Sequence, residues 1–169
     1  LDETVGWLLG RQGSDGGWNC ENPRTGSTHG SFHTSISALD ALQGYRGAGG
    51  TVGVAGALWR GQQFFLAHRL FRSHRTGQVV SPALARFPFP PQWHFDVLRG
   101  LEHFRAAGAA RDPRLADGIE QVRRRRRADG TWPRYRGYPG RVWFELEHGS
   151  RSRWATLRAM RVLRWWESS

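Results

Sequence analysis

The chain has 169 residues, which is long enough for one compact domain with a buried core. All 25 basic residues are arginine, so the formal net charge of +11 comes entirely from guanidinium groups. Only Arg123 to Arg127 form a dense basic run, which is typical of a solvated face and makes a nucleic-acid partner unlikely. The single cysteine, Cys20, excludes an internal disulfide framework, and no apolar stretch reaches the roughly 20 residues that cross a bilayer. We therefore expect a soluble, cytoplasmic protein.

The first predicted helix, about 1–12, has an apolar stripe that starts at the first residue. Leu1, Val5, Leu8 and Leu9 recur at the spacing of one helix face. Because the chain begins inside this stripe, we expect it to be the C-terminal part of a longer array of helices.

An internal repeat organises the rest of the chain. Leu39, Leu98 and Leu157 are separated by 59 residues each time. The same offset aligns further apolar residues, Ile36 with Phe95 and Trp154, Leu42 with Leu101 and Met160, and Tyr45 with Phe104 and Leu163. These positions advance by three in every copy, which predicts three equivalent helices.

A weaker helix is predicted before each of these three. The weaker helices cover about 1–12, 54–71 and 113–127, and Asp112 and Pro113 provide an N-cap and a first helical residue for the last one. The resulting helix pairs cover about 1–48, 52–107 and 112–167. We therefore predict a single all-α domain that contains an array of three helix-pair repeats.

The turn inside the helix pair has a recurring sequence in two copies. It reads Asp15-Gly16-Gly17-Trp18 in the first copy and Asp129-Gly130-Thr131-Trp132 in the third, whereas the middle copy has Arg75-Thr76-Gly77. The glycine permits the left-handed backbone that ends a helix. The tryptophan can then fold back over the helix end, so we interpret it as a packing residue and not a catalytic one.

Long loops follow these turns and lead into the amino ends of the second helices. They cover 19–30, 72–92 and 133–149, and they differ in sequence between the copies. Loops carry function more often than the helices that support them, so we expect the functional residues at this end of the array. In the middle loop, the stiff segment from Phe87 to Pro91 fixes how Trp93 and His94 enter their helix.

Two of these motifs resemble known enzyme families. The segment from Gln12 to Trp18 resembles the glutamine-tryptophan repeat of squalene and hopene cyclases, and the third copy keeps Gly130 and Trp132 but has Arg126 in place of the glutamine. His33 and Thr34, followed by Leu39 and Leu42, resemble the histidine-bearing inner helix of protein prenyltransferase β subunits. Both families share an α/α toroid whose inner helices line an aromatic cavity. The resemblance implies a toroid-like partial barrel.

The chain departs from both families in its reactive residues. The cyclases protonate their substrate with an Asp-rich motif, and no Asp-x-Asp-Asp stretch occurs here. The prenyltransferases hold zinc with Asp and Cys that precede the His by one helix pair, whereas Cys20 lies thirteen residues before His33. The resemblance therefore implies a hydrophobic, prenyl-type substrate, but it does not carry over either family's mechanism as a whole.

The residues themselves predict a candidate metal site at the amino ends of the second helices. His33 and His94 both fall in the predicted first turns, Asp96 follows, and Cys20 lies in the connecting loop. Cys, His and carboxylate are the ligands that zinc favours, so Cys20, His33, His94 and Asp96 are the candidate ligands. The alternative is structural, with the histidines and Asp96 bonded at helix starts and Cys20 packed as a small apolar residue.

A second candidate cluster lies in the last loop and the helix after it. Glu147 is a candidate for acid/base chemistry, together with Asp96, because carboxylates beside guanidinium groups at a cavity mouth can move protons. The candidate substrate-binding residues are an aromatic wall and one cation, Trp93, Phe95, Arg153 and Trp154. The alternative is an ion-pair network that joins the loop to the helix.

Three functions follow from this reading. The first is an enzyme of the prenyltransferase or terpenoid cyclase type, a transferase, lyase or isomerase that uses an aromatic cavity and a zinc ion. The second is a non-catalytic binding or scaffold module that uses the concave helical face. The third and weakest is an arginine-driven nucleic-acid binder. Three helix pairs are too few to close a toroid, so we expect a homodimer or additional N-terminal repeats to cover the exposed edges.

Overall fold

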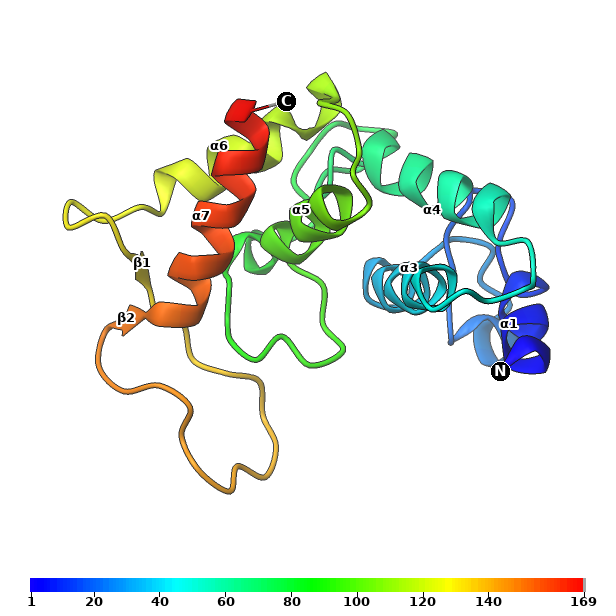
Figure 1. Cartoon of the computed structure of the whole chain (residues 1–169), viewed down its shortest axis with the longest axis horizontal. Helices are drawn as coiled ribbons and strands as arrows, with labels where there is room; N and C mark the ends of the chain where they lie inside the picture. The colour runs from blue at the N-terminus through cyan, green and yellow to red at the C-terminus, as the bar shows by residue number, and fades with distance from the viewer. Residues whose placement is uncertain (169) are drawn as a thin grey trace. The chain divides into compact units, whose positions relative to one another are not determined.

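The structure is a computed structural model that describes residues 1–168, apart from the side chain of Asn22. It is mostly helical, with one two-stranded sheet, which confirms the all-α prediction (Figure 1). The chain divides into two compact units, Leu1–His68 and Arg69–Ser169. Each unit has its own buried apolar residues and is described by itself.

The first unit consists of four helices, two of which form its core. The helices are α1 (Asp2–Leu9), α2 (Asn22–Thr25), α3 (Phe32–Gly47) and α4 (Ala55–Ala67). Ser31 caps α3, since its side chain accepts a hydrogen bond from the amide of Thr34. The facing sides of α3 and α4 supply the fully buried core, in which Leu39 and Phe65 have no exposed surface. The repeat predicts α1 with α3 and α4 with α5 as pairs, so the packing of α3 on α4 joins helices from two consecutive predicted pairs.

The second unit places helix α5 between α6 and α7. Its elements are η1 (Pro82–Ala85), α5 (Val97–Ala106), η2 (Pro113–Leu115), α6 (Ala116–Arg124), β1 (Trp132–Pro133), β2 (Arg151–Ser152) and α7 (Arg153–Ser168). Strands β1 and β2 pair antiparallel, with Trp132 opposite Ser152. Contacts of α5 with both α6 and α7 bury its apolar side chains. None of the helices described in residues 1–168 is both long and apolar enough to cross a bilayer.

The helix ends differ from the prediction where the local backbone stops the helix. The predicted helix 54–71 ends at Ala67, because Arg69 and Leu70 adopt positive φ angles of 43° and 70°. The predicted helix 113–127 starts as a 3₁₀ turn capped by Asp112 and ends as an α-helix at Arg124. The prediction that His94 lies in the first turn of its helix is wrong. Asp96 is the N-cap of α5, and its side chain accepts the amide hydrogen bond of Arg99.

The two turn motifs have the same structure in both units, which confirms their predicted packing role. Gly16 and Gly130 have φ angles of 85° and 83°. Trp18 is 2% exposed, and its indole N–H donates to the carbonyl of Leu8 at 2.8 Å. Trp132 is fully buried, and its indole N–H donates to the carbonyl of Val122 at 2.8 Å. Each tryptophan therefore packs on the end of the preceding helix and bonds to a carbonyl ten residues earlier in the chain.

Gln12 and Arg126 occupy corresponding places in these two motifs. The amide of Gln12 donates to the carbonyl of Gly16 at 2.8 Å and to the carbonyl of Ala57 at 2.9 Å, while its oxygen accepts from Arg60. Arg126 donates through Nε to the carbonyl of Gly130 at 3.4 Å. The arginine in the third copy thus makes a contact equivalent to that of the glutamine, four residues before the same glycine.

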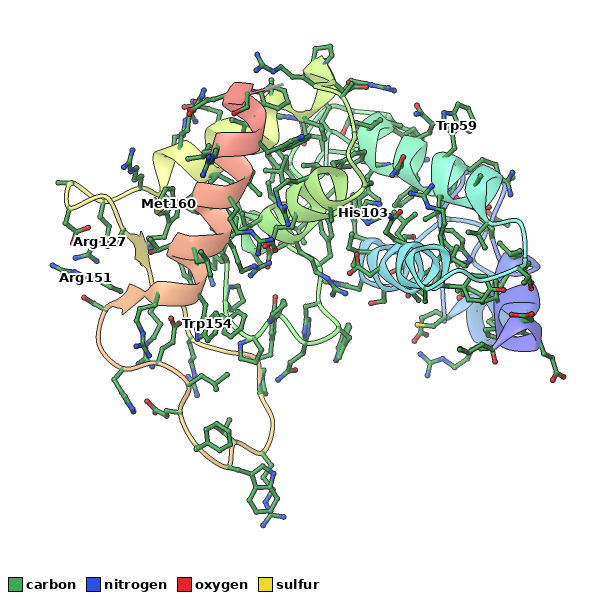
Figure 2. All side chains as sticks on the ribbon, in the orientation of Figure 1. Trp59, His103, Arg127, Arg151, Trp154 and Met160 are labelled. Carbon is green, nitrogen blue, oxygen red and sulfur yellow. The ribbon has the colours of Figure 1, made fainter. Side chains whose placement is uncertain are left out.

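The repeated stripe is buried in the first two copies and exposed in the third. Leu39 and Leu98 have no exposed surface, whereas Leu157 is 49% exposed and Met160 is 54% exposed. The second helices begin at residues 32, 97 and 153, so their starts are not equally spaced although their stripes are. The buried residues of α7 are instead Ala155, Arg158, Ala159 and Val162, while Trp154 and Met160 are exposed (Figure 2).

Candidate functional site

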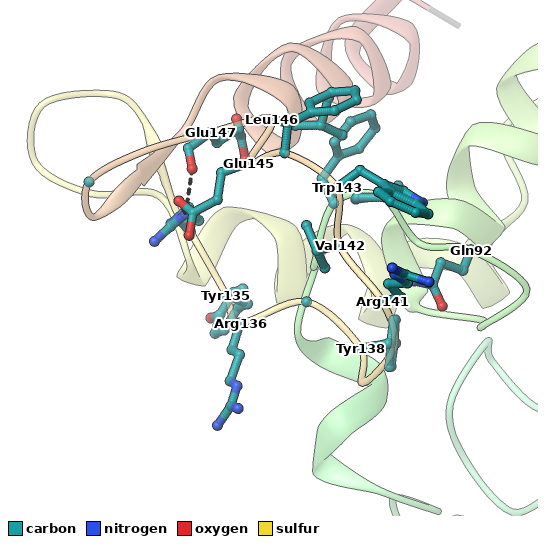
Figure 3. A pocket seen from close by; sticks show the side chains of 16 residues that line it. Gln92, Tyr135, Arg136, Tyr138, Arg141, Val142, Trp143, Glu145, Leu146 and Glu147 are labelled. Atoms are coloured by element: carbon teal, nitrogen blue, oxygen red, sulfur yellow. Dashed lines mark hydrogen bonds and ion pairs between the residues drawn. The ribbon is translucent and has the colours of Figure 1, made fainter.

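An open pocket of about 550 Å³ lies in the second unit, between the loop that joins β1 to β2 and the segment before α5. Gln92, Tyr138 and Arg141 lie at one end of it, and Glu145 and Glu147 lie at the other (Figure 3). Its apolar walls are formed by Phe89, Pro90, Tyr135, Tyr138, Val142, Trp143, Phe144 and Leu146. The pocket therefore combines an aromatic wall with a few charged groups, as small-molecule sites do.

The base of the loop is held closed by hydrogen bonds across its two ends. The backbone amide of Arg134 donates to the carbonyl of Ser150 at 2.9 Å, which continues the pairing of β1 with β2. The guanidinium of Arg134 donates to the carbonyl of Glu147 and forms an ion pair with Glu145 at 3.5 Å. These contacts fix the two ends of the pocket-forming segment.

Glu147, a predicted acid/base residue, positions the start of α7. It is 5% exposed; one carboxylate oxygen accepts from the hydroxyl of Ser152 at 2.7 Å, and the other accepts from the amide of Trp154 at 3.0 Å. A carboxylate is favourable at a helix N-terminus, where amide groups lack intrahelical partners. Glu147 also lines the pocket, but both of its oxygens are already occupied.

Asp96, the other predicted acid/base residue, is fully buried. One carboxylate oxygen accepts from the amide of Arg99 at 2.8 Å, while the other makes no hydrogen bond within the part of the chain that the structure describes. Burial raises the pKa of Asp96 to about 6, against the opposing effect of the Arg158 guanidinium. Arg158 itself is 8% exposed and bonds Glu102 at 2.7 Å.

A stack of rings connects the surroundings of Asp96 to the pocket wall. The imidazole of His94 stacks on Tyr138 with a centroid distance of 3.3 Å and on Trp93 with a distance of 3.8 Å. Burial lowers the pKa of His94, which favours the neutral ring. Burial and the nearby charge of Asp96 raise the pKa of Tyr138, which lines the pocket. Tyr138 is therefore a pocket residue whose pKa depends on the charge of Asp96.

The four predicted substrate-binding residues have different surroundings. Trp154 stacks on the pocket residue Phe89 with a centroid distance of 4.9 Å. Trp93 is 61% exposed and stacks on His94. Phe95 is 1% exposed and packs against Gly100 in the core, and Arg153 is exposed at the first turn of α7. Of the four, Trp154 is nearest to the pocket wall.

The four predicted metal ligands divide between the two units. Cys20 and His33 lie in the first unit, where the hydroxyl of Thr34 donates to the Cys20 sulfur at 3.4 Å. His94 and Asp96 lie in the second. Within residues 1–168, no group of three or more His, Cys, Asp and Glu side chains is arranged to hold a metal ion. The zinc site therefore stays a prediction from the sequence, and no step below uses a metal.

Sequence reasoning missed the residues that form most of the pocket wall, in particular Tyr138, Trp143 and Phe144. The loop 133–149 is predicted to be functional, but that prediction rests on its glutamates and not on its aromatic residues. The sequence does contain a signal for them, the apolar run Val142-Trp143-Phe144 shortly after Pro139 and Gly140. Consecutive apolar residues in a loop cannot all be buried on one helix face, so they indicate a binding surface.

Comparisons with known proteins give no identification. No protein family matches the chain, and neither a curated protein nor a solved structure shows significant similarity to it.

Proposed function

We propose that the chain is a terpene cyclase- and prenyltransferase-like protein of the α/α toroid type, which binds a hydrophobic, prenyl-type small molecule in the aromatic pocket of its second unit. The observation that carries the proposal is the pocket of about 550 Å³ with its wall of Phe89, Tyr138, Trp143 and Phe144. A branched hydrocarbon gains favourable free energy by leaving water for such a wall.

The recurring turn motifs support the toroid part of the proposal. Both motifs have a glycine with positive φ, Gly16 or Gly130. In both, the tryptophan two residues later donates its indole N–H to a carbonyl of the preceding helix. Such repeated junctions are what a stack of equivalent helix pairs requires. The exposed stripe of α7 begins at Trp154, which stacks on the pocket residue Phe89.

For an enzyme of this type, Asp96 is the candidate acid. Its pKa of about 6 allows the carboxyl to hold a proton near neutral pH, and its charge acts on Tyr138 at the pocket wall. Glu147 fits a positioning role better, because both oxygens are engaged at the start of α7. The catalytic role of Asp96 stays a prediction, as does the dependence on zinc.

A binding titration tests the proposed function. We expect a fluorescent farnesyl analogue to bind the purified chain saturably, and we expect unlabelled farnesol to displace it. Replacing Phe89 or Tyr138 with alanine removes an aromatic wall and should weaken binding by about ten-fold or more. Trp59→Ala is the control, because Trp59 lies in the first unit and is 61% exposed.

Two outcomes would contradict the proposal. Absence of saturable binding would remove the function altogether. Equal affinities for the wild type and both pocket variants, with their folding verified by circular dichroism, would place the ligand elsewhere in the molecule.

The exposed stripe of α7 favours a second candidate function, a scaffold that pairs with a second copy of the chain. Leu157 and Met160 are 49% and 54% exposed although their counterparts in the earlier copies are buried. A solution mass measurement tests this function. A dimer that the double substitution L157S and M160S converts to a monomer would support it, and a monomeric wild type at all concentrations would refute it.

A further inference from the structure

The end of the β1–β2 loop exposes a run of large apolar side chains. Val142 is 67% exposed, Trp143 is 77% exposed and Phe144 is 72% exposed, and Leu146 follows at 42%. The loop extends away from α5, α6 and α7 (Figure 1). These side chains are contiguous in the chain, unlike the single exposed apolar residues that are common on protein surfaces.

Two arginines without a carboxylate partner among the described residues lie in the same loop as this run. Arg136 and Arg141 are exposed and form no ion pair with any residue between 1 and 168. The guanidinium of Arg141 lies over the indole of Trp143 at 4.1 Å from the ring centroid. The nearest carboxylates are already engaged, since Glu145 contacts Arg134 and His148 and Glu147 caps α7. The loop end is therefore both apolar and cationic.

The positive charge of the protein belongs to the unit that carries this loop. Only four of the 25 arginines lie in residues 1–68, together with five of the 14 carboxylates. The second unit thus has 21 arginines against nine carboxylates. A unit with this excess of positive charge attracts an anionic surface.

We propose that the β1–β2 loop docks on an anionic lipid bilayer, with Val142, Trp143 and Phe144 inserted below the headgroups. Tryptophan is preferred at the boundary between headgroups and acyl chains, where its ring is partly apolar and its N–H stays hydrated. Arginines beside it meet the lipid phosphates while their stems remain near the apolar layer. The contact of Arg141 with Trp143 places a cation beside the apolar run, and Arg136 lies in the same loop.

Vesicle sedimentation with the whole chain tests this docking. We expect binding to vesicles of phosphatidylcholine and phosphatidylglycerol, and at least ten-fold weaker binding to phosphatidylcholine alone. The triple substitution V142S, W143S and F144S should weaken binding to the mixed vesicles by at least ten-fold, and R136Q with R141Q should reduce the preference for phosphatidylglycerol. The matched control is Trp59→Ser, a similarly exposed tryptophan of the first unit, which should bind like the wild type.

Each other result overturns the docking. If the triple variant, with an unchanged melting temperature, binds mixed vesicles as the wild type does, the attraction is purely electrostatic and involves no insertion. If Trp59→Ser weakens binding equally, the loop is not the docking element. If the wild type ignores all vesicles and the triple substitution instead lowers its solution mass, the loop covers a second copy of the chain. Trp143 and Phe144 also line the pocket, but the vesicle assay contains no farnesol, and the farnesyl titration uses Phe89→Ala and Tyr138→Ala, which lie outside the inserted run. This inference and the proposed function therefore fail separately.

Discussion

The carboxyl of Asp96 is the most perturbed acid in the second unit, and its burial is a cost to the folded state. Its pKa rises from 3.8 to about 6 on folding, because desolvation outweighs the nearby guanidinium of Arg158. The folded protein therefore keeps this proton at pH values where the unfolded chain has lost it. The contribution of Asp96 to the free energy of unfolding therefore decreases as the pH rises from about 4 to 6, by up to about 3 kcal/mol in total.

Asp96→Asn should remove this pH dependence, since asparagine keeps the acceptor for the Arg99 amide but does not ionise. We expect the free energy of unfolding of the variant, relative to the wild type, to increase between pH 4 and pH 7 and to be constant above that. Urea denaturation at several pH values measures it. A difference that does not change with pH would show that the carboxyl titrates normally.

Gly16 is the residue of the turn motif that tolerates a side chain least. A Cβ there would lie 2.3 Å from the carbonyl oxygen of Arg60, and its φ of 85° disfavours any L residue. Gly16→Ala should destabilise the first unit by more than about 2 kcal/mol. Gly26→Ala is the matched control, because Gly26 has a φ of 65° but nothing within 4 Å, and it should cost about 1 kcal/mol. Equal losses in urea denaturation would show that the Arg60 contact relaxes.

Residues with a local role could be predicted from the sequence, while residues with a non-local role could not. Trp18, Asp112 and Trp132 bond to partners within ten residues, so spacing was enough to assign them. The stacking of Tyr138 on His94 joins residues from separate loops, and no periodic pattern encodes it.

At the scale of single elements, α5 and α7 carry the same stripe in different environments. Leu98 is fully buried against its neighbours, whereas Leu157, 59 residues later, is 49% exposed. Leu98→Ala should therefore cost about 2–5 kcal/mol, and Leu157→Ala less than about 1 kcal/mol. Urea denaturation of both variants at low protein concentration measures this. Comparable losses would mean that α7 is covered in solution.

The existence of the helices was easier to predict than their ends. Apolar positions three residues apart predicted α3, α5 and α7, because one face of each helix has to pack against a neighbour. The predicted start of α5 is too early in the chain. The 59-residue repeat aligns the apolar positions of the helix, but it does not indicate that Asp96 is the N-cap. The end of α4 depends on the positive φ angles of Arg69 and Leu70. The intrinsic backbone preferences of arginine and leucine do not predict such angles.

For the whole molecule, the repeat predicted three helix pairs. The structure has two compact units of unequal charge, and the boundary between them falls inside the second predicted pair, 52–107. The aromatic pocket and the exposed apolar run both belong to the β1–β2 loop of the second unit. Neither could be derived from the repeat, because this loop is the part that the copies do not share. The toroid, the prenyl-type ligand and the partner of α7 all remain proposals that rest on this unit.

Photo-crosslinking tests the proposed function most directly. A farnesol analogue carrying a benzophenone group would be irradiated with the chain, and the modified peptides would be mapped by mass spectrometry. The proposed site predicts labelling within residues 134–149 and at Phe89, competed by unlabelled farnesol and reduced in Tyr138→Ala. Labelling confined to Leu1–His68, or labelling that farnesol does not compete, would contradict a prenyl-binding pocket in the second unit.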